Sequence, residues 1–492
     1  MENTYLLKSA QVSFGDDYGT DISLASDDAD STETHISIVS GPNGTSKSRV
    51  LASIVNFLCK VRDGKDAYPQ RQYNASETHG LLCESVEAIK NGRKNYLAIS
   101  PESRQQDQEF LPSRILVISN LVMDRFNFAK DMNLRASFYL YLGVRQASNL
   151  TTTGSIERSL TEAIINMAGD APRLALFQEW LHLASFNTEE LIFEFPKLSR
   201  REIDLFLRGV GNRVQFIEQR VSRRRGTGRQ PPDAAEVEQI TTAVTRVFEF
   251  LASRGEAQVD GLASGRSTER LFLHLNRLSR GDAEEFQTLS DSFSSLQKAG
   301  YAGWPTLLLG ERKVPVSSLS SGEQNVLAVG SKLISYAVPG SLIVIDEPEV
   351  SLNVAWQQRY IDLIWGSLKF ASNSHVIIAT HSPHLISNLP KGKATLVTAK
   401  RTPNGATFQT QDARFEGWGS EAILYQVLGI TAASSSLFYK DLASVLAHIQ
   451  NGGQDLALIK GFLEKARRLD FAGVEPLELV VREIAVYAES IA

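Results

Sequence analysis

The segment THISIVSGPNGTSKS, residues 34–48, decides the fold of this 492-residue chain. Its first half is an apolar run that predicts a buried strand, and its second half, Gly41 to Ser48, is a glycine-rich turn. Apolar residues then recur at helical spacing from Val50 to Leu58, which predicts a helix directly after the turn. Strand, tight loop and helix in this order form the context that a phosphate-binding loop requires. We therefore expect an anion site at the turn.

The turn nearly satisfies the phosphate-loop pattern of Gly, four residues, Gly, Lys and then Ser or Thr. Gly41 and Gly44 permit backbone conformations that turn successive N–H groups inward, and the helix adds its positive N-terminal end. Lys47 would reach the β and γ phosphates of a nucleotide, and Ser48 would ligate Mg²⁺. Ser46 stands where the pattern has glycine, which puts a Cβ where the backbone approaches the phosphate most closely. A purely structural glycine turn is the alternative. The expected nucleotide contacts are Gly41, Pro42, Asn43, Gly44, Thr45, Ser46, Lys47 and Ser48.

A second apolar strand, Ser341 to Ile345, is followed directly by carboxylates at its C-terminal end, where open α/β sheets place ligands. Asp346 can hold the Mg²⁺ shell, and Glu347 can polarise an attacking water. A buried strand that ends in acids is common, so the phosphate loop is what makes this pair informative.

The stretch Ser318 to Gln324 opens another helical pattern. A serine and a glycine at a helix start can form a second anion site. Ser320 followed three residues later by Glu323 also fits an ordinary capping box, and both interpretations can hold together. The residues that we expect at this second site are Ser320, Ser321, Gly322 and Glu323.

In combination these motifs resemble the ATP-binding-cassette class of ATPases, in which the signature of one subunit closes over a nucleotide held by the phosphate loop of another. LSSGE, Leu319 to Glu323, is most similar to the variant found in chromosome-maintenance, RecF-like and phage-defence ATPases. The resemblance implies a D-loop at Ser351-Leu352-Asn353 and a switch histidine, His381, that contacts the γ-phosphate. His384 is interpreted as structural.

The same resemblance implies two further features near the nucleotide. A glutamine should end the strand that leads into the helical lobe, and the matching strand, Arg114 to Asn120, ends in Asn120. An adenine-stacking aromatic residue should follow the first strand, and Phe14 and Tyr18 are candidates, although each is more typical of a core or a turn.

These patterns predict an α/β fold: an ABC-type P-loop ATPase head with a mixed or parallel sheet, a large helical lobe inserted between phosphate loop and signature, and a helical C-terminus. Residues 1–120 would form the N-terminal part of the nucleotide-binding lobe, and residues 121–315 a mainly helical insertion. Residues 316–400 would carry the signature, the acidic strand end and the switch histidine, and residues 401–492 a mainly helical region. Its three expected helices are Phe438 to Gln450, Leu456 to Leu469 and Pro476 to Glu489.

Composition limits the remaining functions. The chain is 42% hydrophobic and 22% charged, and we find no apolar run near the ~20 residues that a spanning helix needs, so we expect a cytoplasmic protein without a membrane partner. Two cysteines, Cys59 and Cys83, exclude a disulfide framework or a cysteine-rich zinc module. The net charge is −5, so any nucleic acid must bind a local basic face. The stretch Lys197 to Arg229 has ten basic residues against three acids, a net of +7, and a solvated helix face balanced by acids elsewhere accounts for it equally well.

Three hypotheses follow. The resemblance favours a stand-alone ATPase similar to those of the Septu and PARIS anti-phage systems, since roughly 270 residues separate phosphate loop and signature and no heptads, zinc hook or nuclease motif is evident. Such a protein would bind ATP and Mg²⁺, assemble head to head as at least a dimer, hydrolyse ATP slowly and control a separately encoded effector nuclease. The second hypothesis is a RecF-like DNA-repair clamp. The third is a scaffold that binds ATP without hydrolysing it.

Overall fold

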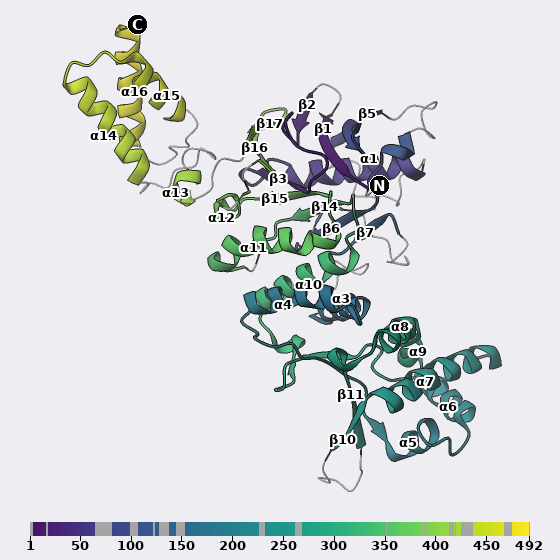
Figure 1. Ribbon diagram of the computed structural model, residues 1–492. Helices are drawn as coiled ribbons and strands as arrows, with labels where there is room; N and C mark the ends of the chain where they lie inside the picture. Colours follow the sequence, from purple (N-terminus) through teal and green to yellow (C-terminus); the bar gives the residue numbers. More distant parts are fainter. Residues whose placement is uncertain are drawn as a thin grey trace.

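The computed structural model describes residues 3–15, 18–63, 81–98, 107–121, 124–126, 137–143, 153–225, 232–260, 268–350, 352–387, 389–390, 392–412, 418, 420–424, 436–466 and 475–491. Three sheets run through this part of the chain, and helices cover them (Figure 1). The fold is α/β, as the sequence predicted.

The central sheet has seven strands in the order β17-β16-β3-β15-β14-β6-β7. All neighbouring pairs are parallel except β16 and β17, which form an antiparallel hairpin. Strands covered on both faces are expected to be continuous apolar runs, and the four strands predicted on that basis, β3, β6, β14 and β15, are confirmed. The strands are β3 (His35–Ser40), β6 (Ile115–Ser119), β7 (Tyr139–Tyr141), β14 (Leu342–Asp346), β15 (His375–Thr380), β16 (Ala394–Thr402) and β17 (Gly405–Asp412).

The two faces of the central sheet pack against different layers. Along β14, Leu342 and Val344 join one apolar cluster with α1, while Ile343 and Ile345 join another with α3, α4, α10 and α11, because successive side chains of a strand point to opposite faces. Gly330 of α10 marks how closely the second layer packs, since a Cβ there would lie 2.3 Å from the ring of Trp180 in α4. The helices are α1 (Lys47–Asp63), α3 (Thr153–Met167), α4 (Ala171–Leu183), α10 (Ser321–Tyr336) and α11 (Val354–Ser367).

A four-stranded antiparallel sheet, in the order β2-β1-β4-β5, packs on the α1 side. Strand β4 runs for ten residues against β1. Gly92 lies in the turn between β4 and β5. The strands are β1 (Tyr5–Phe14), β2 (Gly19–Ser23), β4 (Leu81–Lys90) and β5 (Arg93–Ala98).

The insertion contains helices, and it also contains a third sheet that the sequence did not predict. Its main path is β10-β11-β8-β12-β13, and β9 pairs with β11. These strands have two to seven residues, too few to separate period two from period 3.6. In addition, β7 lies within the range expected to be the insertion but belongs to the central sheet. The strands are β8 (Leu191–Glu194), β9 (Leu198–Ser199), β10 (Glu256–Asp260), β11 (Thr268–His274), β12 (Thr306–Leu309) and β13 (Val314–Pro315). The helices are α5 (Arg200–Phe206), α6 (Arg213–Arg225), α7 (Ala234–Arg254), α8 (Arg280–Leu289) and α9 (Phe293–Lys298).

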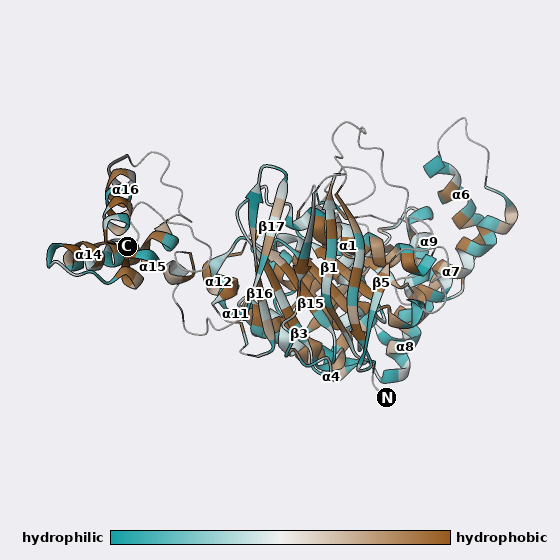
Figure 2. Ribbon diagram, turned by 90° about the horizontal axis from the view of Figure 1, so that it is seen from above, coloured by the Kyte–Doolittle hydropathy of each residue, from teal (hydrophilic) through white to brown (hydrophobic). Residues whose placement is uncertain are grey.

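The C-terminal helices have an apolar cluster of their own, which includes Phe438, Ile459 and Ile484. In two perpendicular views they lie at one end of the molecule, and the helices of the insertion lie toward the other (Figure 1, Figure 2). The three predicted helices correspond to α14 (Ser436–Gln450), α15 (Leu456–Ala466) and α16 (Glu475–Ser490). Within the described residues, every helix is too short or too polar to cross a bilayer.

Candidate nucleotide site

Three neighbouring parallel strands end at one edge of the central sheet and bring the predicted site residues there. The phosphate loop follows β3, Asp346 ends β14, and His381 follows β15. The parallel register aligns Ser40 with Thr380, and Asp346 with Ala379, so the three strand ends are level. The carboxyl edge of a parallel sheet is where α/β proteins bind ligands.

The phosphate loop closes around its own lysine. The Lys47 ammonium donates to the carbonyl of Gly41 at 2.8 Å and to that of Pro42 at 3.3 Å, and the side chain is 5% exposed. Gly41 passes so close to β16 that a Cβ would lie 2.4 Å from the carbonyl oxygen of Ala399. Ser46, at the position where the pattern has glycine, adopts φ 62°, a left-handed conformation that costs a non-glycine residue about 1–2 kcal/mol.

The two predicted Mg²⁺ ligands contact each other. Ser48 Oγ donates to Asp346 Oδ1 at 2.7 Å. Asp346 is fully buried, and its second oxygen, Oδ2, has no hydrogen-bond partner in the described residues. Burial raises the pKa of this carboxyl to about 6. A hydroxyl and an underpaired buried carboxylate are hard oxygen donors, so this pair fits Mg²⁺.

The predicted base and switch residues also meet. His381 Nδ1 lies 2.5 Å from Glu347 Oε2, and the other carboxylate oxygen of Glu347 lies 3.8 Å from the Lys47 ammonium. Glu347 adopts φ 49°, an uncommon conformation for a residue other than glycine and one that occurs often at functional sites. Burial, together with the neighbouring Glu349, raises the pKa of Glu347 to about 7.

Sequence reasoning gave no role to Glu349, which organises this corner. Its Oε1 accepts hydrogen bonds from Thr380 Oγ1 at 2.5 Å and from the backbone N–H groups of His381 at 2.7 Å and Ser382 at 3.1 Å. It therefore fixes the turn that carries His381. Glu347, Glu349 and His381 together place one ligand atom each within 4.8 Å of the others, an arrangement that could also hold a metal ion. The position of Glu349, two residues after Glu347, was the signal in the sequence that could have identified it.

Asp124 is a second buried acid that the sequence did not single out. It is 3% exposed, accepts from the hydroxyl of Tyr141, and its charge contributes to the raised pKa of Asp346. It follows β6, the neighbour of β14, so the topology of the sheet and not a motif places it beside the site.

The signature residues are not brought to this edge within one chain. Ser320 caps α10: its backbone N–H donates to Glu323 Oε2 at 2.8 Å, and its hydroxyl is 3.4 Å from the Glu323 amide, so the capping box is confirmed. Ser321 and Gly322 form the first turn of the same helix. Helix α10 packs against α3, α4 and α11, whereas α1 packs against β1 and β4 on the other face.

The remaining residues implied by the resemblance are placed as follows. Asn353 caps α11 by accepting from the Trp356 amide at 2.9 Å, and Ser351 lies outside the described residues. His384 Nδ1 is 2.7 Å from Ser420 Oγ. Asn120 directly follows β6. The rings of Phe14 and Tyr18 are 6.0 Å apart, and Phe14 packs so closely on Gly405 that a Cβ there would lie 2.8 Å from its ring.

Part of the basic stretch from Lys197 is neutralised within the insertion, and its last residue, Arg229, lies outside the described residues. Four of its arginines form ion pairs at 2.5–3.0 Å, two of them with acids from α7. The pairs are Arg208 with Asp204, Arg213 with Glu249, Arg220 with Glu202, and Arg225 with Glu236.

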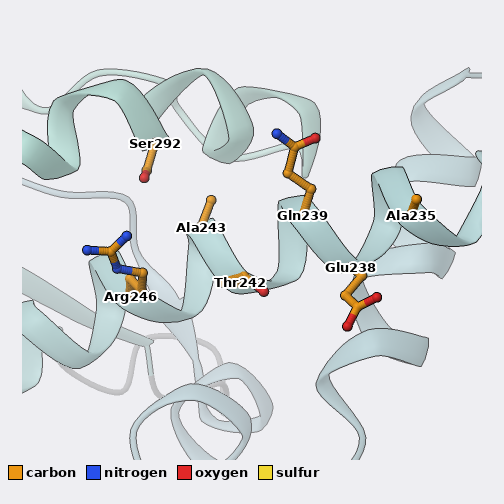
Figure 3. Close-up of a pocket in the computed structure, with 7 residues that line it drawn as sticks. All are labelled: Ala235, Glu238, Gln239, Thr242, Ala243, Arg246 and Ser292. Atoms are coloured by element: carbon orange, nitrogen blue, oxygen red, sulfur yellow. The ribbon is translucent and has the colours of Figure 1, made fainter.

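A hollow on the surface of α7 lies within the insertion and is distinct from the nucleotide site. Side chains of α7 and Ser292 line it, and in Figure 3 Gln239, Ala243 and Ser292 face one another across it while Glu238 points away. No residue that the sequence singled out lines it. We place the candidate site at the sheet edge, where the charged groups converge.

Part of the chain is similar to a known protein family. Residues 173–387 match a family described as AAA domain, putative AbiEii toxin, Type IV TA system. The matched segment includes Asp346, Glu347 and His381 and begins after the phosphate loop. No protein of curated function matches the chain.

Solved structures with similar folds include SMC heads. A crystal structure of the SMC head bound to the C-winged helix domain of ScpA has 13% identity and a TM-score of 0.33, covering 83% of this chain and 98% of that one. The SMC head domain from Thermotoga maritima has 11% identity and a TM-score of 0.28, covering 82% and 99%. The SMC head domain with an extended coiled coil bound to the C-terminal domain of ScpA, derived from Pyrococcus furiosus, has 11% identity and a TM-score of 0.32, covering 83% and 96%.

Proposed function

We propose that this chain binds ATP with Mg²⁺ at the carboxyl edge of its central sheet and hydrolyses it slowly. The contact between Ser48 and Asp346 at 2.7 Å is the observation that carries the proposal. It joins two motifs that lie 298 residues apart in the sequence. Such motifs act together when they hold the Mg²⁺ of a bound nucleotide.

The residues have separate tasks in this reaction. Lys47 leaves the loop carbonyls that it now contacts and neutralises phosphate oxygens, while the loop amides cradle the phosphate chain. Ser48 and Asp346 would hold Mg²⁺, which neutralises charge on the β and γ phosphates as the bond breaks. Glu347, as a carboxylate, accepts a proton from the attacking water, and His381 hydrogen-bonds that carboxylate. The resemblance implies that His381 would also contact the γ-phosphate.

The nucleotide would be enclosed by two copies of the chain. Ser320 and Gly322 begin a helix that packs on the opposite face of the sheet from α1, so the signature of one copy is free to close over the phosphate loop of another. The amide groups at the start of α10 and the positive end of the helix suit a terminal phosphate. Hydrolysis then removes the group that both copies hold, which loosens the pair.

The biological setting follows from the resemblance of the motifs to stand-alone ATPases of anti-phage systems such as Septu and PARIS. In this setting the ATP-dependent assembly works in the cytoplasm and controls a separately encoded effector nuclease. The AAA family that matches residues 173–387 is itself described as a putative toxin of a toxin–antitoxin system, which supports a role in such a defence.

The test is ATP turnover of the purified chain beside Glu347→Gln, with the bound nucleotide identified in both. Glu284→Gln in α8 is the matched control, because its side chain is 65% exposed and lies in the insertion. We expect turnover in the parent and the control, and loss of turnover in Glu347→Gln with ATP retained. Bound ATP without turnover in the parent would contradict the enzyme hypothesis and favour a nucleotide-stabilised scaffold. Ser46→Gly would then show whether the left-handed serine causes the lack of turnover. Absence of nucleotide binding in the parent would refute the proposal.

A further inference from the structure

Strand β16 extends along the phosphate loop beyond the end of its neighbour β3. The two strands are parallel, and Ser40, the last residue of β3, is level with Thr398. From that point β3 gives way to the phosphate loop, while β16 continues for four more residues to Thr402. The end of β16 is therefore a side wall of the loop.

Two residues of this wall lie close to two glycines of the loop. A Cβ on Gly41 would lie 2.4 Å from the carbonyl oxygen of Ala399, and a Cβ on Gly44 would lie 4.0 Å from Nη1 of Arg401. Ala399 and Arg401 are two apart on one strand and so share a face. Val397, on the same face, belongs to the apolar cluster that contains α1. Arg401 thus lies on the side of the sheet where the loop and α1 are.

The Arg401 guanidinium is exposed, and among the described residues it has no acidic or hydrogen-bonding partner. The arginines of the insertion give a contrast, because four of them pair with acids at 2.5–3.0 Å. A guanidinium with no acidic partner among the described residues, held beside a glycine-rich loop that is expected to bind phosphate, is arranged as phosphate-binding arginines are.

We propose that Arg401 is a nucleotide-binding residue of this site, contributed by β16, whose guanidinium contacts a phosphate of the ATP held by the phosphate loop. This inference rests on the proposed function, since it adds a contact to the same site. Lys400, its neighbour in sequence, lies on the opposite face of β16 and makes no such contact.

The experiment measures the affinity of Mg²⁺-ATP for the full chain by isothermal titration calorimetry. Arg401→Gln removes the charge and keeps most of the side-chain length, Arg401→Lys keeps the charge, and Lys400→Gln makes the same charge change on the other face of the strand. We expect Arg401→Gln to weaken ATP binding roughly tenfold or more, as the loss of a charged hydrogen bond does. Lys400→Gln should stay within about twofold of the parent. Arg401→Lys should bind ATP no more weakly than Arg401→Gln, because lysine keeps the charge but not the planar fork of the guanidinium. Unfolding curves without nucleotide show whether each variant is folded, and the exposure of Arg401 makes folding of all three the expected result.

Each outcome separates this inference from the proposed function. If the parent binds ATP and Arg401→Gln binds it as tightly as Lys400→Gln does, the inference is wrong and the proposed function stands. If Arg401→Lys is as weak as Arg401→Gln while Lys400→Gln binds like the parent, the phosphate contact needs the planar guanidinium as well as its charge, and the inference stands. If the parent binds no ATP, the proposed function fails first.

Discussion

The nucleotide site and the insertion both contain charged side chains, but these side chains differ in how many of their polar atoms have a partner. In the insertion, Glu202 accepts hydrogen bonds from Arg220 at 2.7 Å and from the Tyr301 hydroxyl at 2.8 Å. The charges of Glu202 and Arg220 therefore neutralise each other. At the sheet edge, one buried oxygen of Asp346 and one of Glu349 have no partner in the described residues.

This contrast shows how charge in the sequence is to be interpreted. Four arginines of the strongest basic run, from Lys197 onward, pair with acids of the insertion, whereas the site is built from isolated charges that are far apart in the chain. Buried polar atoms are normally paired, so unpaired ones indicate a ligand more reliably than the density of charge does. Four predictions test the contrast, in order of decreasing effect.

The largest effect is expected at Lys47. Its side chain is 5% exposed. Among the described residues its ammonium is bonded only to carbonyls of its own loop and to the more distant Glu347, so it is available to phosphate. We expect Lys47→Ala to weaken ATP binding roughly hundredfold or more, on the order of 3 kcal/mol, because a charge-assisted contact in a dry site is lost. Equilibrium binding of ATP is the measurement, and the exposed Lys369→Ala is the control. Equal affinity in both variants would contradict the assignment of the loop.

The second effect is on stability and lies in the insertion. Glu202 also accepts from the Ser199 amide at 2.8 Å, so Glu202→Ala leaves several buried donors without an acceptor. We expect a loss of about 2–3 kcal/mol in the free energy of unfolding, with ATP affinity unchanged. Asp204→Ala, on the same helix α5, removes only the exposed pair with Arg208 and should cost below about 1 kcal/mol. Chemical denaturation measures both, and similar losses would mean that the insertion does not depend on its internal charge network.

The sequence predicted the nucleotide lobe better than the insertion for a physical reason. Strands such as β14 and β15 are buried on both faces, so a run like Leu342 to Asp346 is distinctive, and a glycine turn between such a strand and a helix is typical of a phosphate loop. Strands β8 and β12 have four residues each, and their apolar runs fit a helix equally well.

Within the site, the sequence predicted the residues that carry motifs and missed those placed by topology. Glu349 fixes a turn that follows a different strand, and Arg401 reaches Gly44 only because β16 pairs with β3. Neither of these two arrangements can be inferred from a fixed spacing of residues along the sequence. The pairing of the arginines with Glu236 and Glu249 was missed for the same reason, since those acids come from α7.

The third prediction concerns two buried histidines at the opposite end of the central sheet from the site. His375 Nδ1 accepts the Leu7 amide at 3.1 Å and its Nε2 is 2.7 Å from Ser37 Oγ, so protonation would remove an acceptor that the backbone uses. Burial lowers the pKa of His35 to about 4 and that of His375 well below 6.5. The unfolded chain therefore takes up protons below pH 6.5 that the folded chain does not, and stability falls as the pH drops from 6.5 toward 4.

The expected slope is about 1 kcal/mol per pH unit for each histidine, measured by urea unfolding between about pH 7 and pH 5. His35→Asn should reduce this slope by the contribution of one histidine. The parent and the variant have the same carboxylates, so the carboxylate contributions cancel when the two slopes are subtracted. An unchanged slope would show that His35 is protonated in the folded state.

The smallest effect is expected at the exposed end of α6. Arg223 and Arg224 are exposed in the last turn of this helix, so they are candidates for a nucleic-acid contact in the described part of the basic stretch. Because two isolated surface cations are weak binders, we expect the double variant Arg223→Gln, Arg224→Gln to change stability by less than about 0.5 kcal/mol and duplex DNA affinity by less than about twofold. The measurement is DNA binding over a series of salt concentrations. A large loss of affinity with a shallower salt dependence would instead assign phosphate contacts to α6 and favour the RecF-like hypothesis. It would also mean that the insertion, like the nucleotide site, has charged side chains that are available to a ligand.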